Sequence, residues 1–196
     1  MFARLNYLVQ LSHSHRIARR YFVTNGFDGV LAMLGLLMGF RVSGSGSLEI
    51  MISACIGAAV ALFMSGLTSA YISEAAEKER ELRDLEKSML TSLSDSAHAD
   101  AARFMPFLVA AVNGLSPLIL ALVVLTPLLL AQQQRWLEIS PLDAAIAIAM
   151  FLAFMLGVFL GRLSGRFWLW TGLRALVIAL LTSLIILLLN QFLMSA

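Results

Sequence analysis

Five long apolar segments constrain this chain more than any other feature of its sequence. A helix needs about 20 mainly apolar residues to cross the hydrocarbon core of a bilayer, and five segments of the 196-residue chain meet or approach that length. Charged residues make up only 13% of the chain, against about 25% in a soluble domain. The pattern predicts an all-α integral membrane protein in the lipid bilayer, with five transmembrane helices at Tyr21–Phe40, Glu49–Ile72, Phe104–Ala131, Ala144–Gly161 and Phe167–Leu193.

The distribution of basic residues predicts the orientation of these spans. Twelve of the 14 lysines and arginines lie in the N-terminal arm, in the connection after the second span, or between the fourth span and the first turns of the fifth. Arg41 and Arg135 lie on the opposite side. Because lysine and arginine accumulate on the cytoplasmic side of a membrane, we expect the N-terminus in the cytoplasm and the C-terminus outside. The net charge of +2 gives no reason to expect a nucleic-acid partner.

A charged segment, Ser73–Leu90, follows the second span with no glycine or proline between them. The second span is therefore predicted to continue into the cytoplasm as one long helix, with a narrow apolar stripe at Leu82, Leu85 and Met89. A polar linker, TSLSDSAHAD, then leads to the third span. The predicted organisation is an amphipathic cytoplasmic arm (1–20), spans one and two (21–72), the acidic helix with its linker (73–103), and spans three to five (104–196).

Small residues at a spacing of four predict close contacts between the spans. Gly35 and Gly39 form one such pair, and Gly157 and Gly161 form another. Glycine at this spacing allows two helix backbones to approach each other. We interpret these pairs as packing motifs.

One carboxylate, Asp28, lies within the first span. A charged residue at the centre of a span costs about 2.5–3.5 kcal/mol on insertion scales, so an ionisable residue in that position is a candidate functional residue. Asn25 lies one turn earlier, and the flanking glycines allow another helix to approach. Asp28 is suited to bind a divalent cation or to exchange a proton. The alternative is a structural carboxylate at the interface that caps a helix or pairs with Arg19 or Arg20.

The third span contains a proline within a polar sequence, NGLSP, Asn113 to Pro117. Proline has no backbone N–H, so it frees the carbonyl one turn earlier, at Asn113. Such a break is tolerated only where protein or a water-filled cavity covers it, and carriers use free carbonyls to coordinate cations. The alternative is a packed proline kink.

Four carboxylates, Glu74, Glu77, Glu81 and Asp84, fall along one face of the acidic helix because they follow helical spacing. Such a row could collect divalent cations before they enter a pore. The alternative is a solvated helix held by ion pairs between residues four apart.

Enzyme chemistry has no visible basis in this sequence. The three histidines form no H-x-x-x-H pair, and the sequence contains no nucleophile–base pair or phosphate loop. The single cysteine, Cys55, lies in an apolar segment and offers neither a disulfide nor a cysteine-based metal site. We therefore expect a protein that is not an enzyme.

Four segments, taken in their order and spacing, resemble the vacuolar iron transporter family in its shorter, prokaryotic-type form. NGFDGVLAMLGLLMG (25–39) is similar to the first-span Asp-Gly signature, and YISEAAE (71–77) to the Tyr-Leu-Ser-x-x-x-Glu exit from span two. NGLSPL (113–118) is similar to the Gly-x-x-Pro-Leu of span three, and GLRALVIALLTSLI (172–185) to the last span. The likeness extends from about Arg20 to Phe192.

This resemblance implies a homodimer in the cytoplasmic membrane of a prokaryote that exports ferrous iron or manganese in exchange for protons. The metal is cargo, and no permanently bound cofactor is implied. The metal-binding residues implied are Asp28 on the ion path, Glu74, Glu77 and Glu81 on the acidic helix, and Met89 as a soft ligand. The transport path expected is formed by Asp28, Asn25, Ser65, Thr68, Asn113 and Pro117.

The second span departs from the family pattern. The family carries Asp-Gly-x-Ser-Met-Gly-x-Gly-Glu-Tyr there, whereas this chain reads SGLTSAY, with Ser65 at the Asp position. Two alternatives to metal export therefore stay open. The same scaffold could carry a different substrate, since a fold does not determine a function. The chain could also be a non-transporting membrane protein whose acidic helix binds a cytoplasmic partner.

Overall fold

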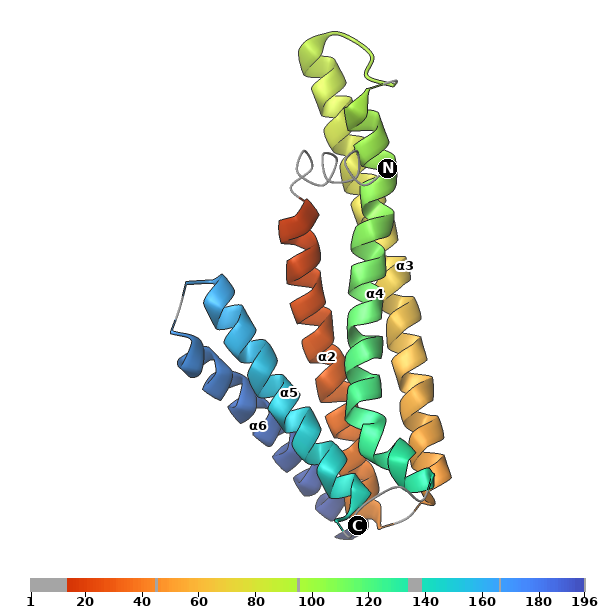
Figure 1. Cartoon of the computed structure of the whole chain (residues 1–196), viewed down its shortest axis with the longest axis vertical. Helices are drawn as coiled ribbons and strands as arrows, with labels where there is room; N and C mark the ends of the chain where they lie inside the picture. The colour runs from red at the N-terminus through yellow and green to blue at the C-terminus, as the bar shows by residue number, and fades with distance from the viewer. Residues whose placement is uncertain (1–13, 45, 95, 134–138, 166, 196) are drawn as a thin grey trace. The chain divides into compact units, whose positions relative to one another are not determined.

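The computed structural model describes residues 14–44, 46–94, 96–133, 139–165 and 167–195, and these are helical apart from short connections (Figure 1). The helices are α2 (Ser14–Ser43), α3 (Leu48–Met89), α4 (Ala97–Gln132), α5 (Pro141–Leu163) and α6 (Trp168–Ser195). Residues 1–13 of the predicted amphipathic arm lie outside the described residues.

All five described helices are long and apolar enough to cross a membrane, in agreement with the predicted all-α membrane class. Helix α3 has 42 residues and is continuous. At 1.5 Å per residue it is about 63 Å long, twice the roughly 30 Å of a hydrocarbon core. The predicted continuation of the second span into the charged segment is therefore confirmed as one helix.

The connection between α3 and α4 is shorter than predicted. Helix α3 ends before Leu90, which has a φ of 53° and so turns the chain in the left-handed region. The Leu93 N–H donates to the Glu86 carboxylate at 2.8 Å, and the Ser96 hydroxyl accepts from the Ala99 N–H at 3.3 Å. Because Ser96 acts as an N-cap, α4 begins within the predicted linker, seven residues before the expected start at Phe104.

The described chain forms two compact units, and α2, α3 and α4 each contribute to both. Unit 1 comprises the described part of Met1–Asn25 together with Phe63–Ser116, and unit 2 comprises Gly26–Leu62 and the described part of Pro117–Ala196. In unit 1 the C-terminal part of α3 and the first turns of α4 lie side by side (Figure 1). Each unit has its own cluster of buried apolar side chains, and the larger one is in unit 2.

Helices α5 and α6 of unit 2 pack closely along their length (Figure 1). A Cβ on Gly157 would lie 2.5 Å from the Ala175 Cβ, and a Cβ on Gly161 would overlap the Thr171 hydroxyl. The predicted packing role of Gly157 and Gly161 is thus confirmed. A Cβ on Gly39, in contrast, would meet nothing within 4 Å, so the Gly35/Gly39 pair makes no such contact within the described chain.

The exposed surface of helix α6 is apolar. It buries a row of small side chains, Gly172, Ala175, Ala179 and Ser183, and exposes most of its large apolar ones. A water-soluble helix has the opposite pattern, with polar residues outside. This inversion is typical of a helix whose outer surface is solvated by lipid tails.

Candidate functional site

Three helices contribute polar groups to one cluster within unit 1. The Asn25 side-chain N–H of α2 donates to the Asn113 backbone carbonyl of α4 at 3.0 Å. The Asn113 side-chain N–H in turn donates to the Gly66 carbonyl of α3 at 2.7 Å. The Ser116 hydroxyl of α4 donates to the Phe22 carbonyl of α2 at 2.5 Å. These bonds connect α2, α3 and α4 through polar side chains.

Pro117 explains why the Asn113 carbonyl is available to Asn25. In a regular helix that carbonyl would accept from the N–H of residue 117, which proline lacks. Helix α4 nevertheless runs unbroken from Ala97 to Gln132. The predicted free carbonyl is therefore present but already satisfied, because the Asn25 amide replaces the missing donor.

Glycines allow the backbones to come close enough for these bonds. A Cβ on Gly66 would lie 2.6 Å from the Asn25 Nδ2 and 3.3 Å from the Gly114 Cα. A Cβ on Gly114 would lie 2.8 Å from the Phe63 carbonyl oxygen. Sequence reasoning missed Gly66, although the small residues around it, Ser65 and Ser69, gave a signal for close packing on this span.

The Asn113 side-chain oxygen, Oδ1, has no hydrogen-bond partner although it is buried. Asn113 as a whole is only 4% exposed. Leaving a buried acceptor unsatisfied costs about 1–3 kcal/mol, and such an atom in a native structure calls for an explanation such as a bound water or ion. Asn113 is therefore the residue of this cluster with capacity left for a ligand.

Asp28 of α2 and Pro117 of α4 both belong to unit 2. The Asp28 side chain is exposed on the surface of the single chain. A Cβ on the neighbouring Gly29 would lie 2.6 Å from the Pro117 Cβ, so α2 and α4 are in direct backbone contact there. The flanking Gly29 therefore allows the close approach of another helix that was predicted.

Ser65 and Thr68 flank Gly66 on α3 and are exposed. The Thr68 hydroxyl donates to the Met64 carbonyl of its own helix at 2.7 Å. Neither hydroxyl belongs to the bonds that join Asn25, Gly66 and Asn113. Their predicted place on a transport path stays a prediction.

The carboxylates of the acidic helix are in different environments. Glu74 is 8% exposed and forms a side-chain hydrogen bond with Tyr21 of α2. Glu77 is exposed, and Glu81 pairs at 2.6 Å with the buried ammonium of Lys78. Met89, at the end of α3, is 56% exposed.

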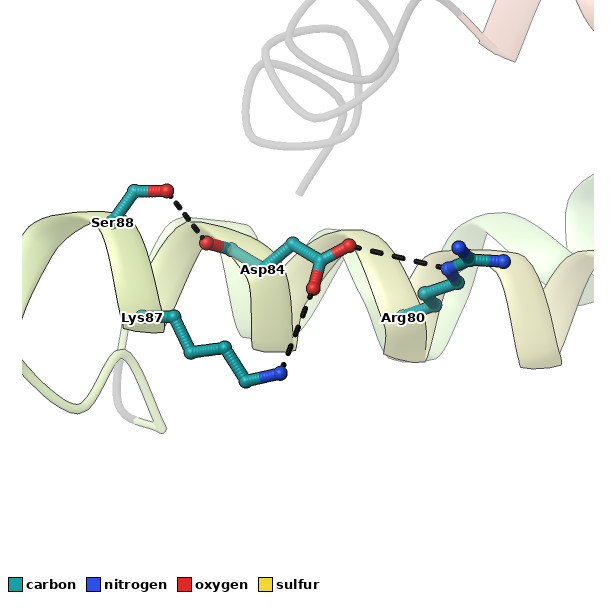
Figure 2. A network of polar contacts seen from close by, with 4 residues as sticks. All are labelled: Arg80, Asp84, Lys87 and Ser88. Carbon is teal, nitrogen blue, oxygen red and sulfur yellow. Dashed lines mark hydrogen bonds and ion pairs between the residues drawn. The ribbon is translucent and has the colours of Figure 1, made fainter.

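Asp84 is surrounded by basic and polar neighbours of its own helix. Figure 2 shows its carboxylate between Arg80, at 4.0 Å, and Lys87, at 3.9 Å, while the Ser88 hydroxyl donates to its backbone carbonyl. Among the described residues, no group of three or more His, Cys, Asp or Glu side chains is arranged to hold a metal ion. The row therefore resembles a solvated, ion-paired face more than a preformed metal centre.

A small pocket of about 110 Å³ lies between the acidic helix and the start of α4. It is lined by Lys78, Glu81, Leu82, Leu85, His98, Ala101 and Ala102. Leu82 and Leu85, two residues of the predicted apolar stripe, are half-buried here. That stripe is thus used largely for packing within the chain.

Comparison with known proteins places the chain beside an archaeal relative. No family model matches the sequence, and no solved structure matches it. The uncharacterized protein MJ0645 of Methanocaldococcus jannaschii is 30% identical over 173 residues, which cover 85% of this chain and 87% of that protein. Likeness of this extent runs through nearly the whole length of both chains, and the chain therefore belongs to the family of MJ0645.

Proposed function

We propose that this protein is a membrane carrier that exports a divalent metal ion, ferrous iron or manganese, from the cytoplasm in exchange for protons. The resemblance of its first span, of the exit from its second span, and of its third and last spans to the vacuolar iron transporter family supports this proposal. The basic residues support an N-terminus in the cytoplasm and a C-terminus outside.

The observation that carries the proposal is the polar cluster of Asn25, Gly66 and Asn113, which joins three helices that are each long and apolar enough to cross a membrane. Its one unsatisfied atom, Asn113 Oδ1, is a hydrogen-bond acceptor. An acceptor attracts cations and proton donors and repels anions. Polar groups inside a membrane bundle mark substrate and ion pathways, and oxygen atoms are the ligands that hard divalent cations prefer.

Asp28 is proposed as the residue that binds the ion and the proton alternately. A carboxylate within a span is costly unless it faces water or another part of the protein, and Asp28 is exposed on the single chain. A homodimer in which the second chain covers this part of α2 would remove the carboxylate from lipid. We therefore include the homodimer in the proposal, with the ion path at or near the interface.

In this proposal the acidic helix attracts cations to the cytoplasmic end of the path. One observation favours a different role for this helix, the binding of a protein partner. Glu77 is exposed and available to attract cations, whereas Glu74 is buried beside Tyr21. Glu81 and Asp84, however, lie beside Lys78, Arg80 and Lys87. A mixed-charge surface suits a cytoplasmic protein partner as well as it suits cation capture, so partner binding is the second candidate function.

The test is flux into liposomes that hold the purified protein. Fe²⁺, Mn²⁺, Co²⁺ and Zn²⁺ would be compared under an imposed pH gradient, in the wild type and in Asp28→Asn. The proposal expects metal flux that depends on the gradient and is lost in Asp28→Asn, with the dimer intact. Gradient-driven flux that persists in Asp28→Asn would remove Asp28 from the mechanism. Absence of flux with any metal in the wild type would refute the carrier and leave another substrate or partner binding.

A further inference from the structure

The orientation of the Asn113 amide is fixed by its neighbour on α3. Its nitrogen lies 2.7 Å from the Gly66 carbonyl oxygen, which can only accept a hydrogen bond. A flipped amide would place two acceptors against each other at that distance, so the nitrogen must face Gly66. The oxygen Oδ1 is consequently held on the other side, where no donor of the described chain meets it.

The backbone of Asn113 is equally constrained. Its carbonyl accepts from Asn25 at 3.0 Å. The next residue, Gly114, packs so tightly that a Cβ there would lie 2.8 Å from the Phe63 carbonyl oxygen. Asn113 thus has little freedom to rotate Oδ1 towards another donor. The atom is preorganised for a ligand, which lowers the entropic cost of binding.

The chemistry of the surrounding groups defines the kind of ligand. The donors of the cluster are the amides of Asn25 and Asn113 and the hydroxyl of Ser116, and each already donates to a carbonyl. Among the atoms of this cluster, the acceptor Asn113 Oδ1 is the one that is buried without any hydrogen-bond partner. A group that binds Oδ1 must therefore bring positive charge or a hydrogen to donate.

We propose that Asn113 Oδ1 is a direct ligand of the carried cation and helps to determine which cation is accepted. The proposal rests on the proposed function and adds the identity of one ligand atom. A neutral amide oxygen is a hard ligand, of the class that suits Mn²⁺, Mg²⁺ and Ca²⁺ better than soft, thiolate-seeking ions. Binding at Oδ1 also requires the cation to shed at least one water, because the atom is buried.

The test measures Mn²⁺ binding to the full chain in lipid nanodiscs, by electron paramagnetic resonance of the free ion. Asn113→Leu keeps the shape of the side chain and removes Oδ1. Thr126→Val is the matched control, because it removes a hydroxyl of the same helix that donates to the Leu122 carbonyl outside the cluster, and it leaves Oδ1 in place. We expect Asn113→Leu to weaken Mn²⁺ binding about tenfold or more, as for the loss of a hydrogen bond to a charged group. Thr126→Val should stay within about twofold of the wild type.

Asn113→Asp provides a second variant in case Asn113→Leu fails to fold. It keeps an oxygen at the position of Oδ1 but places its other oxygen against the Gly66 carbonyl, where only a protonated carboxyl fits. Mn²⁺ binding should therefore become more pH-dependent than in the wild type. Cd²⁺, as a soft ion, should compete with Mn²⁺ less well than Ca²⁺ does.

Two results would overturn the inference. One is Mn²⁺ binding by Asn113→Leu within about twofold of the wild type, which would mean that Oδ1 holds only a structural water. The other is an Asn113→Asp variant whose Mn²⁺ affinity and pH dependence equal those of the wild type. Failure of the carrier hypothesis has a different signature, because Mn²⁺ would then bind in an Asn113-dependent manner while flux is absent from wild-type liposomes.

Discussion

Replacement of Gly66 by alanine tests whether the polar cluster holds α2, α3 and α4 together. The added methyl would lie 2.6 Å from the Asn25 Nδ2 and 3.3 Å from both the Asn113 carbonyl oxygen and the Gly114 Cα. Asn25 is the most mobile of these groups, so its side chain should move first. That movement would break its hydrogen bond to the Asn113 carbonyl, which has no substitute donor because residue 117 is proline.

The size of the effect follows from three contributions. Leaving the Asn113 carbonyl without a donor costs about 1–3 kcal/mol, and inserting a methyl into a tightly packed contact costs about 1–3 kcal/mol. Alanine gains about 1 kcal/mol over glycine in a helix interior. We expect a net loss of about 1–5 kcal/mol in the free energy of unfolding.

The assay is reversible unfolding in mixed micelles, with Gly57→Ala as the matched control. Gly57 lies on the same helix, and a Cβ there would meet nothing within 4 Å. Gly57→Ala should therefore be neutral or stabilise slightly, while Gly66→Ala destabilises. Equal stability of the two variants would refute the reasoning, because it would mean that the close contacts around Gly66 make no energetic contribution.

Two further predictions concern other contacts. Gly161→Ala should destabilise the α5–α6 pair by about 2 kcal/mol, since its methyl would overlap the Thr171 hydroxyl; thermal unfolding should show no comparable loss for Gly39→Ala, whose methyl meets nothing within 4 Å. The Lys78–Glu81 pair should respond asymmetrically, because the lysine side chain is 8% exposed and that of the glutamate 55%. Glu81→Gln leaves a buried ammonium unpaired and should cost about 1–2 kcal/mol more than Lys78→Met, which leaves a carboxylate that water can reach; denaturant titration that ranks them in the opposite order would contradict this.

The membrane class and the number of long helices were predictable because they depend on composition and length alone. A span of about twenty apolar residues can be recognised directly in a sequence. The absence of glycine or proline after Ile72 predicts that α3 continues beyond the span. The start of α4 was not predictable in the same way. Its first turns are polar, and they are helical because Ser96 caps them and the start of α4 packs beside the end of α3.

Individual residues of the candidate site were predictable from the sequence, but the hydrogen bonds that join them were not. Proline chemistry alone predicts a carbonyl without its helical donor at Asn113. The sequence does not reveal that Asn25, 88 residues away, supplies the replacement. Nor does it reveal that the Gly66 carbonyl engages the Asn113 amide nitrogen and leaves Oδ1 unsatisfied. Both facts depend on how three helices cross, and no local pattern encodes that crossing.

In the acidic helix, the spacing of the carboxylates does not predict the environment of each one. Glu74, Glu77, Glu81 and Asp84 share one face by helical periodicity, yet their environments differ. Glu74 is buried beside Tyr21, and Glu81 pairs with the buried Lys78. The carboxylate of Asp84 lies between the basic side chains of Arg80 and Lys87. Spacing predicts a shared face, whereas the neighbours of each carboxylate decide whether it is free to bind a cation.

The measurement that tests the central claim most directly is active accumulation of Mn²⁺ in proteoliposomes. Equal Mn²⁺ would be placed on both sides, and a pH gradient would be imposed across the membrane. We predict net movement of Mn²⁺ towards the more acidic compartment, which stops when a protonophore collapses the gradient and is absent with Asp28→Asn. A Mn²⁺ distribution that stays even under a maintained gradient, in protein shown to be folded, would contradict proton-coupled transport by this chain.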